Sequence, residues 1–370
     1  MHDAMMDGWG NPSSPHVVGR RAKEMLEDSR AAIAGVLGVD ADEIYFTSGS
    51  TESNNLAIRG ACLAQRENPG KIITSTLEHS SVTRTVRGMR RDHGWDCRYV
   101  DAPDGCFDME QLAEQLQDGP TSLISVMRVQ NETGWIFPIP EIAALRDELA
   151  PGVPLHCDAT QAFCKMPVNP REWGVQLLTA GAHKIGGPRG IGILYVQRGL
   201  PMHTTAFGGN QERGLRSGTE PGFLAVGMAE AVRLTAAHMG TNAEYAASLR
   251  DRAIEGLRRE IPDVVVHAPE GGSPYILSVS VPGLPNAVSV KYLSSRRVCV
   301  SRASACEENH ATVAPGTWRP KHPLSLQAAG IPLREGKETL RVSFFHQNTP
   351  EDVDRFVAVL AQCAREMRES

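Results

Sequence analysis

The chain has 370 residues, of which 41% are hydrophobic and 22% charged, and its formal net charge is −5. This length predicts a large domain with a smaller companion, and the lack of a long basic run argues against direct nucleic-acid binding. No stretch approaches the roughly 20 apolar residues that span a bilayer, and the first residues lack the pattern of a secretory signal. Eight cysteines at irregular spacing, without a CxxC pair, favour a reducing cytoplasm and argue against a metal site.

Strand and helix signals alternate through the first half of the chain. A helix is predicted over 15–37, a short strand at 44–46, a hydroxyl-rich glycine turn at 47–53 and a helix opening at 54–58. Further strands are expected at 71–75, 97–100, 122–129, 155–158, 177–180 and 192–196, with helices between several of them, such as 109–117 and 139–149. This alternation predicts an α/β fold with a mostly parallel sheet covered by helices.

The rest of the chain has a different pattern. A helical stretch over 221–262 is long enough to link two domains. Strands are then expected at 275–281, 298–301 and 340–345, an amphipathic helix at 350–368, and a mobile loop at 306–323, which is rich in Pro, His and Thr. We therefore expect a large domain over 15–235 and a small α+β C-terminal domain over 236–370, with residues 1–14 packing nearby.

Asp158 and Lys184, which end neighbouring apolar runs, have the chemistry of a pyridoxal-phosphate site. The lysine can form a Schiff base with the cofactor aldehyde, and the carboxylate can keep the pyridine nitrogen protonated so that the ring accepts electrons. An isolated lysine before a glycine turn is usually only a solvated loop end. However, Thr51, His79 and Asn131 also lie at or just past strand ends, where ligands bind in such sheets.

Other residues have chemistry that suits this site. Backbone N–H groups and hydroxyls of the turn that contains Ser50 and Thr51 can cradle a phosphate, although such turns are more often simply helix starts. His79 can stack on the pyridine ring and shuttle protons. Gln161 can donate a hydrogen bond to the ring hydroxyl oxygen, and Asn131 can reach that oxygen or a substrate carboxylate.

Cys306 and Arg341 are candidates for the chemistry on the substrate. Cys306 lies among small residues where the predicted loop begins, so its thiol is expected to be accessible, whereas Cys157 and Cys299 are expected to be buried and inert. Arg341 lies inside a predicted strand. A buried arginine needs a carboxylate partner, which an amino-acid substrate or a structural ion pair supplies.

Taken together, these motifs resemble the cysteine desulfurases of the class V aminotransferase group, which are fold-type I pyridoxal-phosphate enzymes, and their selenocysteine lyase relatives. The resemblance covers essentially the whole chain. Its motifs lie at 10–16, 46–55, 78–79, 131–132, 156–161, 183–184, 208–219, 305–306 and 341–343.

The resemblance implies a role for each candidate. Lys184 would bind pyridoxal 5′-phosphate covalently, Asp158 would pair with the ring nitrogen, Gln161 with the ring oxygen, and His79 would stack on the ring. The phosphate would be held by Thr51 and His183, and by Thr219 of the neighbouring subunit, which implies a homodimer with shared active sites.

For the reaction, the resemblance implies that Asn131 and Arg341 bind the carboxylate of L-cysteine. Cys306 would take the substrate sulfur as a persulfide, alanine would leave, and the sulfur would pass to an acceptor protein. Iron–sulfur cluster assembly is one of several processes that draw on this reaction, and the sequence does not select among them.

Three alternatives stay open: a selenocysteine lyase, a pyridoxal-phosphate lyase or transaminase in which Cys306 is not a nucleophile, and a non-catalytic scaffold. The chain also departs from the family pattern. It begins after the usual first strand and Ala-Thr-Thr-Pro turn, and the loop after Cys306 is longer than in many relatives. Gly181 stands where a serine often contacts the phosphate, so that hydrogen bond is expected to be lost or replaced, for example by Thr179.

Overall fold

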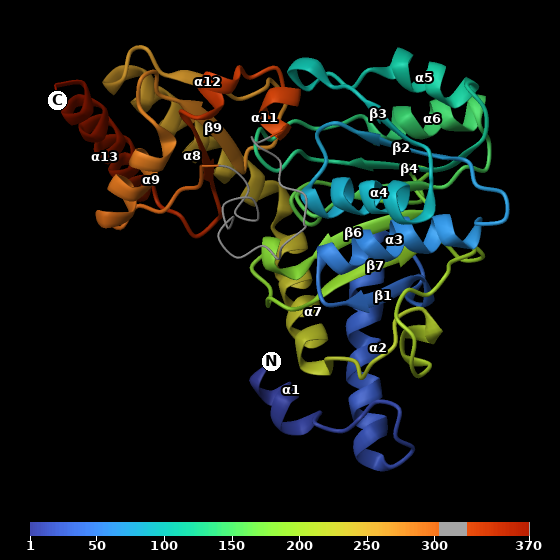
Figure 1. Ribbon diagram of the computed structural model, residues 1–370. Coiled ribbons are helices and arrows are strands. Elements are labelled where there is room, and N and C mark those ends of the chain that lie inside the picture. Colours follow the sequence, from blue (N-terminus) through green and yellow to red (C-terminus); the bar gives the residue numbers. More distant parts are fainter. Residues whose placement is uncertain (303–323, 370) are drawn as a thin grey trace. The chain divides into compact units, whose positions relative to one another are not determined.

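The computed structural model describes residues 1–302 and 324–369, which form two compact units (Figure 1). The first unit contains Met1–Val100, Asp108–Arg128 and Phe137–Met239. The second contains Asp101–Phe107, Val129–Ile136 and the chain from Gly240 onward. Two short segments from within the first part of the sequence therefore belong to the second unit, an arrangement that no sequence pattern indicates.

A seven-stranded sheet in the order β1-β7-β6-β5-β4-β2-β3 forms the centre of the first unit. Its strands are β1 (Ile44–Thr47), β2 (Lys71–Ser75), β3 (Cys97–Val100), β4 (Thr121–Met127), β5 (Leu155–Asp158), β6 (Leu177–Gly181) and β7 (Gly192–Val196). Strand β7 runs antiparallel to both of its neighbours, β1 and β6, and the other pairs of described strands in this sheet are parallel. Every residue of β2, β5, β6 and β7 is buried, as expected for a sheet covered on both faces. The predicted mostly parallel α/β fold is confirmed.

Helices cover this sheet. They are α2 (Val17–Leu37), α3 (Ser50–Ala64), α4 (Ser80–His93), α5 (Met109–Gln117), α6 (Ile139–Leu149) and α7 (Gly222–Ala237). A short helix, α1 (His2–Asp7), packs against α7. Figure 1 shows α3 and α4 side by side over the sheet, and α2 packs against α7. The start of α3 was predicted too late. The helix begins at Ser50 because Gly49 takes a φ of 147°, which lets the chain turn directly from β1 into the helix.

The second unit contains a three-stranded antiparallel sheet in the order β10-β9-β8. Its strands are β8 (Val265–His267), β9 (Ile276–Ser280) and β10 (Thr339–Ser343), and its helices are α8 (Met239–Glu260), α9 (Asn286–Ser295), α11 (Leu324–Ala328), α12 (Leu333–Gly336) and α13 (Pro350–Glu369). The stretch predicted as one helical segment over 221–262 is two helices, since α7 ends at Ala237 and α8 starts at Met239. None of the described helices is both long enough and apolar enough to cross a membrane.

The predicted strand over 298–301 was wrong. Only Ser301 pairs, as an isolated bridge with Arg341. The preceding Arg297 has a φ of 62°, a left-handed conformation that turns the chain instead of extending it. Consequently Cys299 is exposed, which corrects the expectation that it is buried, whereas Cys157 is buried as expected.

Candidate active site

Asp158 lies at the carboxyl end of β5, where it is 5% exposed. Its Oδ2 accepts a hydrogen bond from Asn54 Nδ2 at 2.7 Å, and its Oδ1 accepts one from the Thr160 backbone N–H at 3.0 Å. Among the described residues, no arginine, lysine or histidine forms an ion pair with this carboxylate. Because buried charges are normally paired, Asp158 is suited to receive a cationic N–H from a ligand.

The hydrogen bonds continue from Asp158 toward His79. Asn54 Nδ2 also donates to Ser81 Oγ at 2.8 Å, and Ser81 Oγ lies 2.7 Å from His79 Nδ1. His79 is the N-cap of α4, since its Nδ1 also accepts from the Ser81 backbone N–H. An accepting Nδ1 places the proton of the neutral ring on Nε2. The structure thus connects two predicted site residues through Asn54 and Ser81.

Sequence reasoning missed Asn54 and Ser81. Both lie inside the first turns of helices, where polar residues usually face solvent or cap the helix. Both are buried here because α3 and α4 pack on each other above the strand ends. Asn54 lies in a run of six polar residues, 50–55, so its type does not distinguish it from the more exposed residues of that run.

Lys184 follows β6, the neighbour of β5 in the sheet. The register pairs Asp158 with Thr179, so the chain leaves β6 at Gly181 on the same edge at which β5 ends. A short 3-10 turn, Ala182–Lys184, then carries the lysine, which is half-buried. Partial burial, followed by the charge of Lys184, lowers the pKa of His183, so this histidine is neutral near pH 7.

His156 is fully buried in the middle of this edge. Its Nδ1 lies 2.8 Å from Ser125 Oγ and its Nε2 lies 3.1 Å from Thr179 Oγ1, so one ring connects β4, β5 and β6. Burial lowers its pKa to about 4, which keeps the ring neutral. The Thr179 hydroxyl thus pairs with His156, and a hydrogen bond from Thr179 to the phosphate stays a prediction.

Glu78 is a second buried carboxyl group, beside His79. Its Oε1 accepts from Ser75 Oγ at 2.7 Å and from the Met127 backbone N–H at 2.8 Å, which joins the ends of β2 and β4. Burial raises its pKa to about 8, and the charge of Asp158 acts in the same direction. Glu78 is therefore protonated, and carries no charge, near neutral pH.

The turn that begins α3 is closed by hydrogen bonds between its own groups. Thr47 Oγ1 and Ser53 Oγ lie 2.7 Å apart, and Glu52 accepts from the Ser48 backbone N–H. Glu52 also pairs with Arg216 at 2.9 Å, which fixes the following loop to the helix start. By contrast, the buried Ser50 Oγ has no hydrogen-bond partner among the described residues.

Gln161 follows Asp158 and Thr160 at the end of β5 and is half-buried. Its Oε1 accepts a hydrogen bond from Lys165 Nζ at 3.1 Å. This contact orients the amide so that its N–H groups point away from Lys165. The donation from Gln161 to the ring oxygen stays a prediction.

Two predicted substrate residues come together in the second unit. Arg341, on β10, donates from Nη1 to the backbone carbonyl of Asn131 at 3.2 Å. The segment that carries Asn131 is held to β9 because Ser278 Oγ donates to the Glu132 carbonyl at 2.7 Å. Cys306, the predicted nucleophile, lies outside the described residues.

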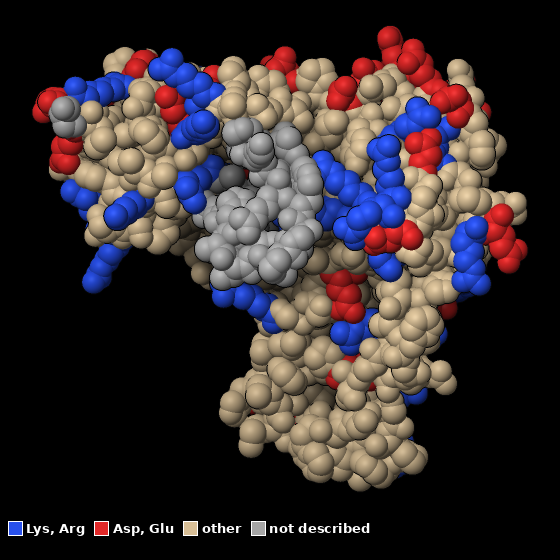
Figure 2. Space-filling model, viewed as in Figure 1, with Lys and Arg blue, Asp and Glu red and all other residues tan. Residues whose placement is uncertain are grey.

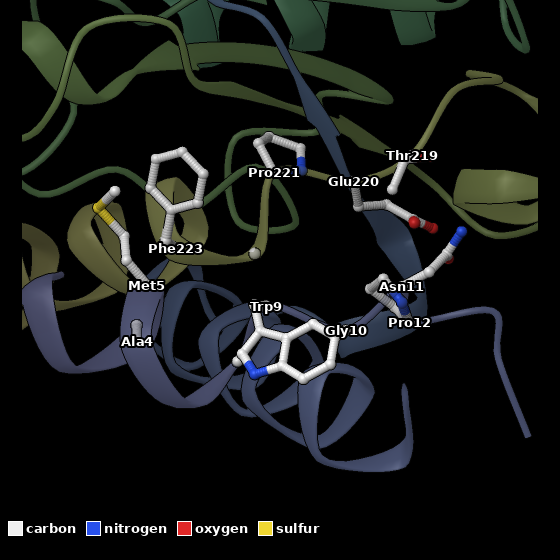
Figure 3. A pocket seen from close by; sticks show the side chains of 12 residues that line it. Ala4, Met5, Trp9, Gly10, Asn11, Pro12, Thr219, Glu220, Pro221 and Phe223 are labelled. Carbon is white, nitrogen blue, oxygen red and sulfur yellow. The ribbon is translucent and has the colours of Figure 1, made fainter. Parts of the chain in front are cut away.

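Thr219 lies in a different environment from the other phosphate candidates. It lines a hollow of about 350 Å³ in the first unit with residues from α1 and the segment that follows it (Figure 3). Trp9, Met5 and Phe223 line the same hollow and are 73%, 52% and 37% exposed. Figure 2 shows few charged side chains over this N-terminal region of the first unit.

Residues 1–356 match the family model described as Aminotransferase class-V. The chain belongs to this family. It is 34% identical to a protein named cysteine desulfurase from Nostoc sp., over 98% of this chain and 88% of that protein. A solved NifS-like protein matches with a TM-score of 0.88 and 30% identity, over 97% of this chain and 92% of that one. A solved SspA in complex with cysteine matches with a TM-score of 0.78 and 29% identity, covering 94% of each chain.

Class-V membership confirms the predicted resemblance and the fold-type I architecture. The cofactor of this family is pyridoxal phosphate. The residues present fit that group. Asp158 offers a buried carboxylate for the ring nitrogen, and Ser50 offers a buried hydroxyl for the phosphate. Gly181 leaves open the space beside that hydroxyl, because a Cβ there would lie only 2.4 Å from Ser50 Oγ. Within the described part of the chain, no cluster of His, Cys, Asp or Glu side chains could hold a metal ion.

Proposed function

We propose that this chain is a pyridoxal-phosphate-dependent cysteine desulfurase, which converts L-cysteine to L-alanine and transfers the sulfur to Cys306. The observation that carries the proposal is the hydrogen-bonded series from buried Asp158 through Asn54 and Ser81 to His79. It occurs on the sheet edge from which Lys184 also emerges. The relatives named cysteine desulfurase favour this reaction over that of a selenocysteine lyase or a transaminase.

The cofactor, held by Lys184, would supply an electron-accepting ring that weakens the carbon–sulfur bond of the substrate. Asp158 would hold a proton at the ring nitrogen, and its donors Asn54 and Thr160 keep the carboxylate in one orientation. His79 would cover the ring, with its orientation fixed by the hydrogen bonds to Ser81. Lys184 Nζ is the group that would carry protons to and from the substrate carbons.

Several further residues would fix the ligands in place. Arg341 and Asn131 would bind the substrate carboxylate, since a guanidinium can form paired hydrogen bonds to it. Gln161 would donate to the ring oxygen. Ser50, Thr51 and His183, with Thr219 from a second subunit, would hold the phosphate.

The sulfur transfer balances without an added oxidant or reductant. The carbon–sulfur bond of L-cysteine breaks, and a sulfur–sulfur bond forms at Cys306 Sγ. The electron pair of the broken bond stays with the carbon, which takes up a proton. One thiol and one L-cysteine therefore give one persulfide and one L-alanine, and the persulfide sulfur is then passed to an acceptor protein, for uses such as iron–sulfur cluster assembly.

We further propose a homodimer with shared active sites. The exposed apolar side chains Met5, Trp9 and Phe223 line the hollow in the first unit, and Met6 is a further exposed apolar residue of α1. Large exposed apolar surfaces usually mark protein interfaces. A second copy covering this surface would bury Trp9 and bring Thr219 close to the other subunit's phosphate.

We propose that residues 15–235 and 236–370 fold as the large and small domains, and that the enzyme works in the cytoplasm. The free state of all cysteines in the described part of the chain suits a reducing compartment.

The decisive experiment compares the purified wild type with Cys306→Ala. The visible spectrum is recorded first, then L-cysteine is added under reducing conditions and alanine and sulfide are measured. A yellow protein that makes alanine only when Cys306 is present supports the proposal. Alanine production that ignores Cys306 would point instead to a lyase, and a chain that binds no cofactor would contradict any pyridoxal-phosphate function.

A further inference from the structure

The buried hydroxyl of Ser50 indicates how this chain would hold the cofactor phosphate, an inference that rests on the proposed function. Ser50 is the first residue of α3, and its buried Oγ has no hydrogen-bond partner among the described residues. Other buried hydroxyls near this turn do have partners, since Thr47 pairs with Ser53 and Thr179 pairs with His156. Burying a hydroxyl without a partner is unfavourable, so Ser50 is positioned for a ligand.

The surrounding backbone explains why the hydroxyl is in this place. A Cβ at Gly181 would lie 2.4 Å from Ser50 Oγ, and a Cβ at Gly192 would lie 2.8 Å from the backbone of Gly49. Gly181 and Gly192 are paired residues of β6 and β7. The lack of side chains at both positions therefore lets the start of α3 lie directly against the ends of these strands, with Ser50 Oγ in the space that a residue-181 side chain would fill.

The first turn of α3 is a favourable environment for an anion. The N–H groups of the first turn of a helix have no partners within the helix, and the helix dipole adds positive potential there. Ser50 Oγ adds a donor to the same helix end. His183, whose ring lies 3.3 Å from the Cβ position of Gly181, belongs to the same surroundings.

We propose that Ser50 Oγ donates a hydrogen bond to the cofactor phosphate, and that Ser50 and Gly181 form an exchangeable pair. The side-chain hydroxyl that donates to the phosphate can come from residue 50 or from residue 181. It cannot come from both, because a Cβ at position 181 would lie 2.4 Å from Ser50 Oγ. Ser50 is thus the residue that replaces the hydrogen bond absent at Gly181.

Four full-length proteins test this proposal after removal of the cofactor: wild type, Ser50→Ala, Gly181→Ser and Ser50→Ala/Gly181→Ser. Each is titrated with pyridoxal 5′-phosphate and, separately, with pyridoxal, which has no phosphate. We expect Ser50→Ala to weaken binding of the phosphorylated cofactor about 10-fold, as is typical for one hydrogen bond to a charged group, and to leave pyridoxal binding unchanged. Gly181→Ser should weaken binding as well, because its hydroxymethyl group collides with Ser50.

The double variant decides the question. If the pair is exchangeable, it binds the phosphorylated cofactor more tightly than either single variant and within about 3-fold of wild type. Binding no better than that of Ser50→Ala would overturn the proposal, as would equal losses for both ligands in Ser50→Ala. Matched controls are Ser29→Ala, whose hydroxyl bonds to the Met25 carbonyl in α2, and Gly240→Ser, where an added Cβ meets nothing.

Two readouts separate the possible causes of failure. Melting temperatures of the cofactor-free variants show whether Gly181→Ser simply fails to fold, and in that case Ser50→Ala with the two ligands still tests the hydroxyl. If wild type binds no pyridoxal phosphate, the proposed function is wrong. If wild type binds it and Ser50→Ala binds equally well, only the role of Ser50 is wrong.

Discussion

The two sides of the proposed site are built differently. In the first unit, Asp158, Asn54, Ser81 and His79 form a continuous series of hydrogen bonds between buried or half-buried groups. In the second unit, Arg341 is half-buried and donates a hydrogen bond to the backbone carbonyl of Asn131. The cofactor side is thus held by hydrogen bonds between side chains before any ligand binds, whereas the Arg341 side chain contacts a backbone carbonyl. Variants on each side should therefore fail in different ways.

The largest effect is expected from Lys184→Ala on the cofactor side. Loss of the amine removes both the covalent attachment of the cofactor and the proton carrier, so alanine formation should fall by on the order of 10³-fold or more. The visible absorbance band of the bound cofactor should change at the same time. An unchanged band in this variant would show that another group holds the cofactor.

Arg341→Ala should affect the substrate side alone. Removing a guanidinium that binds a carboxylate should raise the KM for L-cysteine by roughly 10- to 100-fold, while the dissociation constant of the cofactor stays at the wild-type value. Steady-state kinetics and cofactor titration measure the two quantities. The control is Arg334→Ala, whose side chain is 90% exposed. An Arg341 variant that lost cofactor and substrate affinity together would contradict the division between the two sides.

Asn54→Ala tests whether the cofactor side is as rigid as its hydrogen bonds indicate. The substitution removes the donor to Asp158 Oδ2 and to Ser81 Oγ, so the free energy of unfolding should fall by about 1–3 kcal/mol. Urea denaturation measures this change. Asn55→Ala is the matched control, since Asn55 is half-buried and its side chain donates to the Thr51 carbonyl in the same helix. Equal losses in the two variants would show that Asn54 has no special role.

The sequence allowed prediction of most strands and of the residues at their ends, because buried strands have continuous apolar runs and Asp158 and Lys184 interrupt them. It did not allow prediction of Asn54 or Ser81, whose contacts depend on how α3 packs against α4. Nor did it indicate that Gly49 would start a helix at Ser50, since that depends on a backbone angle. Exposure of Cys299 was missed for the same reason, because the left-handed Arg297 ends the extended run that periodicity suggested.

Glu78→Gln should change only the pH dependence of stability. The pKa of Glu78 is raised by burial from 4.5 to about 8, so the folded chain keeps a proton that the unfolded chain releases between these values. The stabilising contribution is therefore complete below pH 4.5 and is lost as the pH rises through about 8, with a slope of at most about 1.4 kcal/mol per pH unit. Glutamine imitates the protonated acid at every pH, so urea midpoints of Glu78→Gln should fall less between pH 5 and pH 8 than those of wild type. Parallel curves for the two proteins would mean that Glu78 is ionised in the folded state and that Asp158 shares its surroundings with a second negative charge.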